Sequence, residues 1–408
     1  MNKILKQIDW LLIGPFLFLS VIGILVVFSA SSAFPSGAFG FLFRQSLFAL
    51  LGILTVAIFD FFIKIKWLAS PKLASIALGA TFVLLAFARF ISSRSAGTGA
   101  HGWIALPFFN IQPAEIFKIT VILYLSSLAA RRLDKSERQL NRNVQSKVVL
   151  PPAGKRYFGF LPSQIAFVLA NLLLVLIMPD LGNSLIAFFL ILLIVFASGV
   201  HLKWLALMLL TITTLYLFLP TLLNLLPASF LNGNFQARRF LIFLNPWPYS
   251  SSYSMQLINS FYAIAHGGLF GVGLGNSIEK MGYLPEANTD FIMSIFTEEL
   301  GALALFLVVA VLMLMIGRMF YIAFHIKNNF GRLVLYGIGS YFFIQALVNL
   351  GGIIGALPMT GVTFPFISYG GSSFLISSIS VGIACTVSRE YSRQQARQKQ
   401  ASRAGAVI

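Results

Sequence analysis

The chain has 408 residues, of which 58% are hydrophobic and only 10% are charged, and its mean hydropathy is +0.87. This composition excludes a soluble globular protein and predicts an all-α, polytopic membrane protein. The net charge of +17 would indicate nucleic-acid binding in a soluble protein. Here the basic residues fall mainly between apolar runs, which indicates membrane topology and no nucleic-acid partner.

The first apolar run, residues 11–28, follows Lys3 and Lys6 and precedes a stretch of small residues, so a cleaved signal peptide is one interpretation. The run is too long for the apolar part of a signal peptide, and we interpret it as a retained first span. Together with the later runs it predicts ten transmembrane helices, with both termini on one side. The predicted spans are 11–28, 46–63, 72–90, 113–130, 161–178, 181–199, 203–224, 291–315, 333–357 and 371–388.

The distribution of lysine and arginine orients these spans. Basic residues in the 131–160 segment, in the 318–332 segment and near both termini all fall on one side. Because positive residues collect in the cytoplasm, both termini are predicted to be cytoplasmic. The long 225–290 segment, between spans 7 and 8, is then extracellular. We expect residues 1–390 to form one membrane domain and residues 391–408 a basic cytoplasmic tail, a frayed helix near anionic lipid.

Residues 110–118, NIQPAEIFK, lead into the fourth predicted span. Glu115 and Lys118 lie three residues apart, so on a helix they share a face and can pair. Their chemistry favours a structural ion pair, and a pair that serves a functional cavity is the alternative.

Residues 266–280, HGGLFGVGLGNSIEK, are rich in glycine. A dinucleotide-binding loop is excluded because no strand precedes the glycines and no βαβ unit follows them. We expect a tight re-entrant or interfacial turn. Lys280 is then either a cation near Asp290 or an ordinary exposed lysine.

Residues 282–301, GYLPEANTDFIMSIFTEELG, place carboxylates at the start of and inside an apolar helix. Read as a helix from Asp290, the polar and small residues at 290, 294, 297, 298 and 301 share one face. Carboxylates inside a span usually face a cavity or a partner. We therefore predict the wall of a water-accessible cavity, with Asp290 at its rim and Glu298 roughly 12 Å deeper. The alternative is that Asp290 only caps the helix.

Residues 355–374, GALPMTGVTFPFISYGGSSF, join the last two predicted spans. Their prolines, glycines and hydroxyls predict backbone that is not simply helical. Such backbone is tolerated at membrane depth only where protein buries it or where it lines water. We expect a wall of the site that includes Ser368 and Tyr369, with a plain connecting loop as the alternative.

The stretches QPxExxK, PDLG, GGLFGVGLGNS, YLPExxTDFI, EELG and TGVTFPFISYGGSS occur in this order. Together they resemble the SEDS family (shape, elongation, division and sporulation proteins) over about residues 6–390, and they are more similar to FtsW of Gram-positive bacteria than to RodA. The resemblance implies a ten-span peptidoglycan glycosyltransferase of the bacterial cytoplasmic membrane. Such enzymes polymerise lipid II outside that membrane, here in cell division, with a class B penicillin-binding protein transpeptidase and other divisome proteins. The family's essential acid is Asp290 here.

For this chemistry we expect Asp290 to accept the proton of the acceptor sugar's 4-hydroxyl as that oxygen attacks the donor's anomeric carbon, with inversion to a β-1,4 linkage. The pyrophosphate leaving group needs positive charge, which Mg²⁺ or Mn²⁺ would supplement as a candidate cofactor. The candidate substrate contacts are Arg238, Arg239, Lys280, Glu286, Ser368 and Tyr369. A RodA-like elongation polymerase, a lipid II flippase and a scaffold for the transpeptidase are the rival functions.

Overall fold

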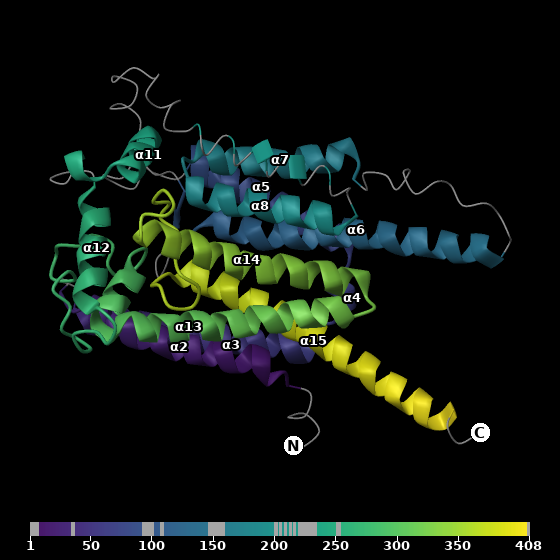
Figure 1. Cartoon of the computed structure of the whole chain (residues 1–408). Helices are drawn as coiled ribbons and strands as arrows, with labels where there is room; N and C mark the ends of the chain where they lie inside the picture. The colour runs from purple at the N-terminus through teal and green to yellow at the C-terminus, as the bar shows by residue number, and fades with distance from the viewer. Residues whose placement is uncertain are drawn as a thin grey trace.

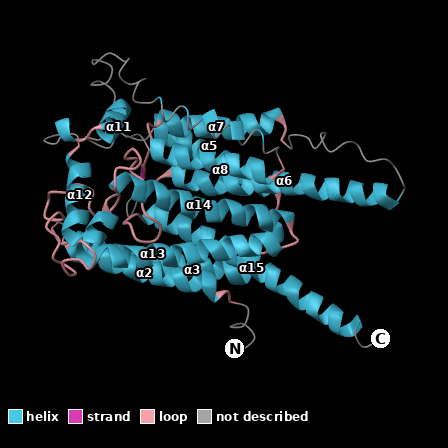
Figure 2. Ribbon diagram, in the orientation of Figure 1, coloured by secondary structure: helices cyan, strands magenta, loops and turns pink. Residues whose placement is uncertain are grey.

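The computed structural model describes residues 8–33, 37–91, 102–106, 110–145, 160–199, a few between 203 and 218, 235–249 and 254–405. Its long helices lie side by side in one bundle (Figure 1). Nearly all of the described chain is helical (Figure 2), and β1 (Ile104–Ala105) pairs with β2 (Asn110–Ile111) as a minimal hairpin. Seven described helices are long and apolar enough to cross a membrane, so the chain is a multi-pass membrane protein.

These helices follow the predicted spans closely. The seven are α2 (Trp10–Ala30), α3 (Ala38–Phe62), α5 (Pro71–Phe90), α6 (Pro113–Gln145), α13 (Ile292–His325), α14 (Asn329–Ile353) and α15 (Gly371–Gly405). Two shorter apolar helices, α7 (Pro162–Ile177) and α8 (Leu181–Ala197), coincide with the fifth and sixth predicted spans. The seventh predicted span, 203–224, lies mostly outside the described residues.

Helices α6 and α14 occupy the middle of the bundle. Their most apolar stretches are 83% and 72% buried, compared with 28% for α3 and for α13. Large side chains such as Phe39 and Phe306 are exposed on these outer helices, where lipid would cover them. Polar side chains are costly against lipid, so the central helices are where a polar site can be built.

Gly301 divides α13 into two parts. Its φ of 82° and ψ of 170° suit glycine almost exclusively, and a Cβ there would lie 2.3 Å from the Leu269 carbonyl oxygen. The glycine-rich turn after α12 (Met255–Gly267) wraps this break: the Val272 N–H donates to the Glu298 carbonyl at 3.0 Å, and the Gly273 N–H to the next carbonyl at 2.9 Å. The predicted tight turn is therefore confirmed, and the predicted unbroken helix from Asp290 is wrong.

The two ends of the bundle differ in content. Helices α11 (Phe235–Leu244) and α12, with the 3₁₀ turn Trp247–Tyr249, belong to the predicted extracellular segment and lie together at what we call the outer end (Figure 1). Helix α2 begins, and α15 ends, away from them. Helix α15 runs unbroken to Gly405, so the predicted boundary at residue 390 falls inside a continuous helix, and fraying of the tail stays a prediction. A short helix, α4 (Ile65–Leu68), joins α3 to α5.

Candidate active site

Asp290 lies at the outer end of the bundle, in the loop between α12 and α13. The helix begins at Ile292 with Phe291 as its N-cap, which makes no side-chain capping bond. The alternative that Asp290 is merely the helix cap is therefore wrong. The carboxylate is half-buried and free of a capping role.

Three charged residues from different segments surround Asp290. Arg239 from α11 attracts it, whereas Glu286 from its own loop and Asp180 before α8 repel it. Gly361 lies close to both Asp290 and Arg239, because a Cβ added to it would be 3.2 Å from Asp290 Oδ2 and 4.0 Å from Arg239 Nη2. The fold thus brings the charges of Arg239, Glu286 and Asp180 within electrostatic range of Asp290.

This environment changes the acidity of Asp290. Burial, followed by repulsion from Glu286, raises its pKa from 3.8 to about 7; attraction to Arg239 opposes the rise, and Asp180 adds to it. Burial likewise lowers the pKa of Arg239. A carboxylate with a pKa near the working pH is well suited to general-base catalysis.

Asp290 lines a small, partly open cleft at the surface of the bundle, with a cavity volume of about 20 Å³. The cleft walls come from the start of α13, the outer end of α14 and the segment 359–362. Asn349 of α14 joins two of these walls, because its Nδ2 donates to the Asp290 carbonyl at 2.8 Å and to the Val362 carbonyl at 2.7 Å. A small polar group entering the cleft would meet Asp290.

Asp180 is a site neighbour that sequence reasoning missed. Its carboxylate caps α8 through the Asn183 N–H at 3.0 Å and accepts a bond of 2.8 Å from Gln112 Nε2. Gly182 lets this helix start approach the cleft, because a Cβ there would lie 2.4 Å from Val362 Cγ2. The available signal was the PDLG stretch, which contributes to the family resemblance but lies far from Asp290 in the sequence.

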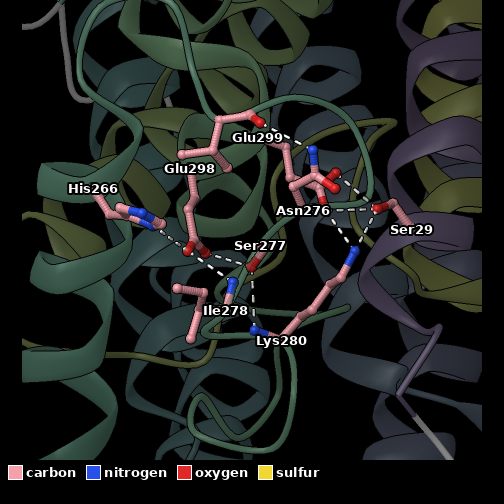
Figure 3. Close-up of polar contacts among 9 residues, drawn as sticks. Ser29, His266, Asn276, Ser277, Ile278, Lys280, Glu298 and Glu299 are labelled. Atoms are coloured by element: carbon pink, nitrogen blue, oxygen red, sulfur yellow. Dashed lines mark hydrogen bonds and ion pairs between the residues drawn. The ribbon is translucent and has the colours of Figure 1, made fainter.

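Glu298 does not line the predicted cavity. It is fully buried and accepts bonds from the Ile278 N–H at 2.9 Å and from the Ser277 hydroxyl, while His266 Nδ1 lies 2.9 Å away (Figure 3). The predicted polar face packs on α12 instead, where the hydroxyls of Ser294 and Ser260 are 2.7 Å apart. A structural role for Glu298 fits this position.

Lys280 also departs from its predicted place as a cation near Asp290. Its ammonium lies 2.7 Å from Glu299 Oε1 and 3.1 Å from the Ser29 hydroxyl of α2, and both charged side chains are 1% exposed (Figure 3). Ser29 in turn donates to the Glu299 carboxylate at 2.7 Å. Lys280 therefore links the loop to α2 through Ser29. It is neither a cation near Asp290 nor an exposed lysine, so both predicted roles are wrong.

The ion pair between Glu115 and Lys118 is present as predicted, with 2.8 Å between its charged atoms and almost no exposure. Lys118 also donates to Gln345 Oε1 at 3.2 Å and lies 5.0 Å from the centre of the Tyr341 ring. This pair is a buried link between α6 and α14.

The other predicted contacts are divided. Ser368 is buried in a turn, where its Oγ accepts from the Phe364 N–H at 2.7 Å, so it is a structural residue. The Tyr369 N–H donates to the Asn288 carbonyl at 2.9 Å, which joins the 355–370 segment to the Asp290 loop. The Arg238 side chain lies outside the described residues.

The predicted Mg²⁺ or Mn²⁺ has no ligand set in the part of the chain that the structure describes. Among those residues, no three His, Cys, Asp or Glu side chains are grouped closely enough to hold a metal ion. The described side chains thus do not fit a resident metal, and the ion stays a prediction from which no step is derived.

The fold and the site define a class: a multi-pass membrane protein with a half-buried acid beside an arginine at one end of its bundle. The chain belongs to the family of cell cycle proteins that comprises FtsW, RodA and SpoVE, which it matches over residues 9–393. The resemblance to the SEDS family is therefore confirmed.

Individual relatives cover nearly the whole chain. The chain is 36% identical over 405 residues to the probable peptidoglycan glycosyltransferase FtsW of Lactococcus lactis subsp. lactis, covering 95% of this chain and 94% of that protein. It is 33% identical over 396 residues to the probable peptidoglycan glycosyltransferase FtsW of Bacillus subtilis, with coverages of 95% and 92%.

Solved structures share the fold. One is a chain of a peptidoglycan synthase complex described as coordinating polymerization and crosslinking, with a TM-score of 0.71, 27% identity and coverage of 94% of this chain and 98% of that chain. Another is the rod shape determining protein RodA of Thermus thermophilus, with a TM-score of 0.63, 23% identity and coverages of 94% and 97%. The second likeness concerns the fold alone.

Proposed function

We propose that this protein is a peptidoglycan glycosyltransferase that polymerises lipid II into β-1,4 glycan strands at the outer face of the bacterial cytoplasmic membrane. The observation that carries this proposal is Asp290, the residue matching the family's essential acid, beside Arg239 on an open cleft. The activity in the names of the relatives from Lactococcus and Bacillus supports it. Ten spans and a cytoplasmic position for both termini belong to the same proposal.

In the proposed reaction, ionised Asp290 removes the proton from the acceptor sugar's 4-hydroxyl while that oxygen attacks the donor's anomeric carbon. The bond from this carbon to the lipid-linked pyrophosphate breaks, and the pyrophosphate leaves with the electron pair. Arg239 stabilises the negative charge of the leaving group. Because a pyrophosphate leaves without being protonated, one carboxylate is enough, unlike the pair that glycosidases use.

The cellular role in this proposal is division. The relatives that share 33–36% identity with the chain carry the FtsW name, which favours an FtsW-like role over RodA-like elongation. The structural likeness to a chain of a synthase complex supports a crosslinking partner, which we propose to be a class B penicillin-binding protein in the divisome.

Asp290→Asn tests the proposal. The two side chains have nearly the same shape, but the amide cannot accept the proton, so purified Asp290→Asn should give no polymer from labelled lipid II. Glu279→Gln is the matched control, because it removes a carboxylate of the same loop that interacts with Glu298 and His266 and is not among the charges acting on Asp290, so it should retain polymerisation. Thermal unfolding should be similar for both variants. Polymer from a folded Asp290→Asn protein at close to the normal rate would refute the general-base assignment.

A further inference from the structure

Helix α14 presents two amide side chains to the segments that carry the site. Gln345 and Asn349 are four residues apart, so they lie on one face of the helix, and both are almost completely buried. Gln345 Nε2 donates to the Thr363 carbonyl at 3.0 Å. Asn349 Nδ2 donates to the Val362 carbonyl at 2.7 Å and to the Asp290 carbonyl at 2.8 Å. The amides of Gln345 and Asn349 thus bind the consecutive carbonyls of residues 362 and 363, and Asn349 also binds the backbone of Asp290.

The ion pair of α6 fixes the orientation of this arrangement. Lys118 donates to Gln345 Oε1 at 3.2 Å, and Glu115 holds Lys118 at 2.8 Å. Because the ammonium is bound to the oxygen side of the Gln345 amide, the nitrogen side must face the Thr363 carbonyl. A continuous chain of polar contacts therefore runs from α6 through α14 to the wall of the cleft.

We propose that Asn349, supported by Gln345, is a positioning residue that holds the Asp290 backbone against the segment 360–363 and so keeps the Asp290 carboxylate in its confined place in the cleft. This inference rests on the proposed function, because it concerns the same carboxylate. The segment that Asn349 holds includes Gly361, where a Cβ would lie 3.2 Å from Asp290 Oδ2.

The arrangement has a measurable signature in the ionisation of Asp290. Burial is the largest cause of its raised pKa, and the charges that face it are Glu286 from its loop, Arg239 from α11 and Asp180 from the start of α8. If the two hydrogen bonds of Asn349 are lost, we expect the walls to separate and more water to reach the half-buried carboxylate. The pKa should then fall from about 7 toward 3.8.

The variant Asn349→Leu keeps the size of the side chain and removes its hydrogen-bond donor. We expect the turnover number for lipid II polymerisation to fall by about tenfold to a hundredfold at pH 8, because small displacements of a catalytic group have effects of this size. The KM should change much less. The midpoint of the acid limb of the pH–rate profile should move to lower pH by about one unit or more. A loss of stability alone would not move this midpoint.

The matched control is Asn171→Leu on α7, which removes an equally buried amide that donates only to its own helix, to the Phe167 carbonyl at 2.9 Å. Its midpoint should equal that of the unmodified protein. Asn349→Ser, which keeps a shorter donor, should shift the midpoint in the same direction but by less. A folded Asn349→Leu protein with an unmoved midpoint would overturn the proposal, and so would failure of both Asn349 variants to fold, since Asn349 would then serve only packing.

The unmodified protein and Asp290→Asn separate this inference from the function on which it rests. If the unmodified protein shows no acid limb, or if Asp290→Asn polymerises lipid II, the assigned base is wrong. If both behave as expected and Asn349→Leu leaves the midpoint in place, only the positioning role fails.

Discussion

The buried ion pair between Lys280 and Glu299 gives a quantitative prediction about what holds the site loop. At 2.7 Å and an effective dielectric constant of about 20, the attraction between the two charges is about 6 kcal/mol. Moving both ions out of water offsets much of this, so the pair contributes little net stability. Removing one partner is different, because it leaves the other charge buried and costs about 3–5 kcal/mol. We therefore expect Lys280→Met and Glu299→Gln each to lower Tm, by about 3–6 °C.

The double variant distinguishes a structural pair from a substrate-binding lysine. Because Lys280→Met with Glu299→Gln leaves no unpaired charge, it should recover more than half of the lost Tm and most of the polymerisation of lipid II. The measurements are Tm by intrinsic fluorescence and polymer length on gels. Additive losses of Tm in the double variant would refute the ion-pair reasoning. A double variant with restored Tm and no polymer would instead return Lys280 to the substrate-binding role predicted from the sequence.

Three further outcomes follow from the geometry. The rate of polymerisation should rise about tenfold from pH 6 to pH 8, because ionised Asp290 is the base and its pKa is about 7. A rate that does not change between pH 6 and pH 8 would contradict this. Gly301→Ala should lower the free energy of unfolding by at least about 1–3 kcal/mol, measured against Gly317→Ala in the same helix, where a Cβ meets nothing within 4 Å. In intact spheroplasts, an impermeant thiol reagent should label Met281→Cys and spare Lys135→Cys, and the reverse pattern would invert the topology.

The positions of the helices could be predicted from the sequence because a membrane span needs a long apolar run, and that requirement is local. The ion pair of Glu115 and Lys118 was predictable for the same reason, since helical spacing alone brings the two residues together. The segment 282–301 was harder. Its periodicity suggested one helix from Asp290, and only the contact of Gly301 with the turn after α12 shows why the helix breaks.

The contacts of the site could not be predicted because they join segments far apart in the chain. Lys280 lies ten residues before Asp290, yet the turn directs it to Ser29 and Glu299. Asp180 reaches Asp290 only because α8 packs against the segment 360–362. Asp290 was assigned as the essential acid from the family resemblance. Its raised pKa could not be predicted, because it depends on the burial that the fold provides.

The hydrogen bond between Ser29 and Glu299 also bears on how the protein is made. These residues are 270 positions apart, so at about 5–20 residues per second Glu299 leaves the ribosome roughly 15–55 s after Ser29. Asn349 and Gly361 emerge later still. During this interval the first helix is already in the membrane without the loop that will fasten to it. The cleft therefore cannot form until residue 362 has been made, and a chain released before that residue has its first helices but neither a completed cleft nor α15.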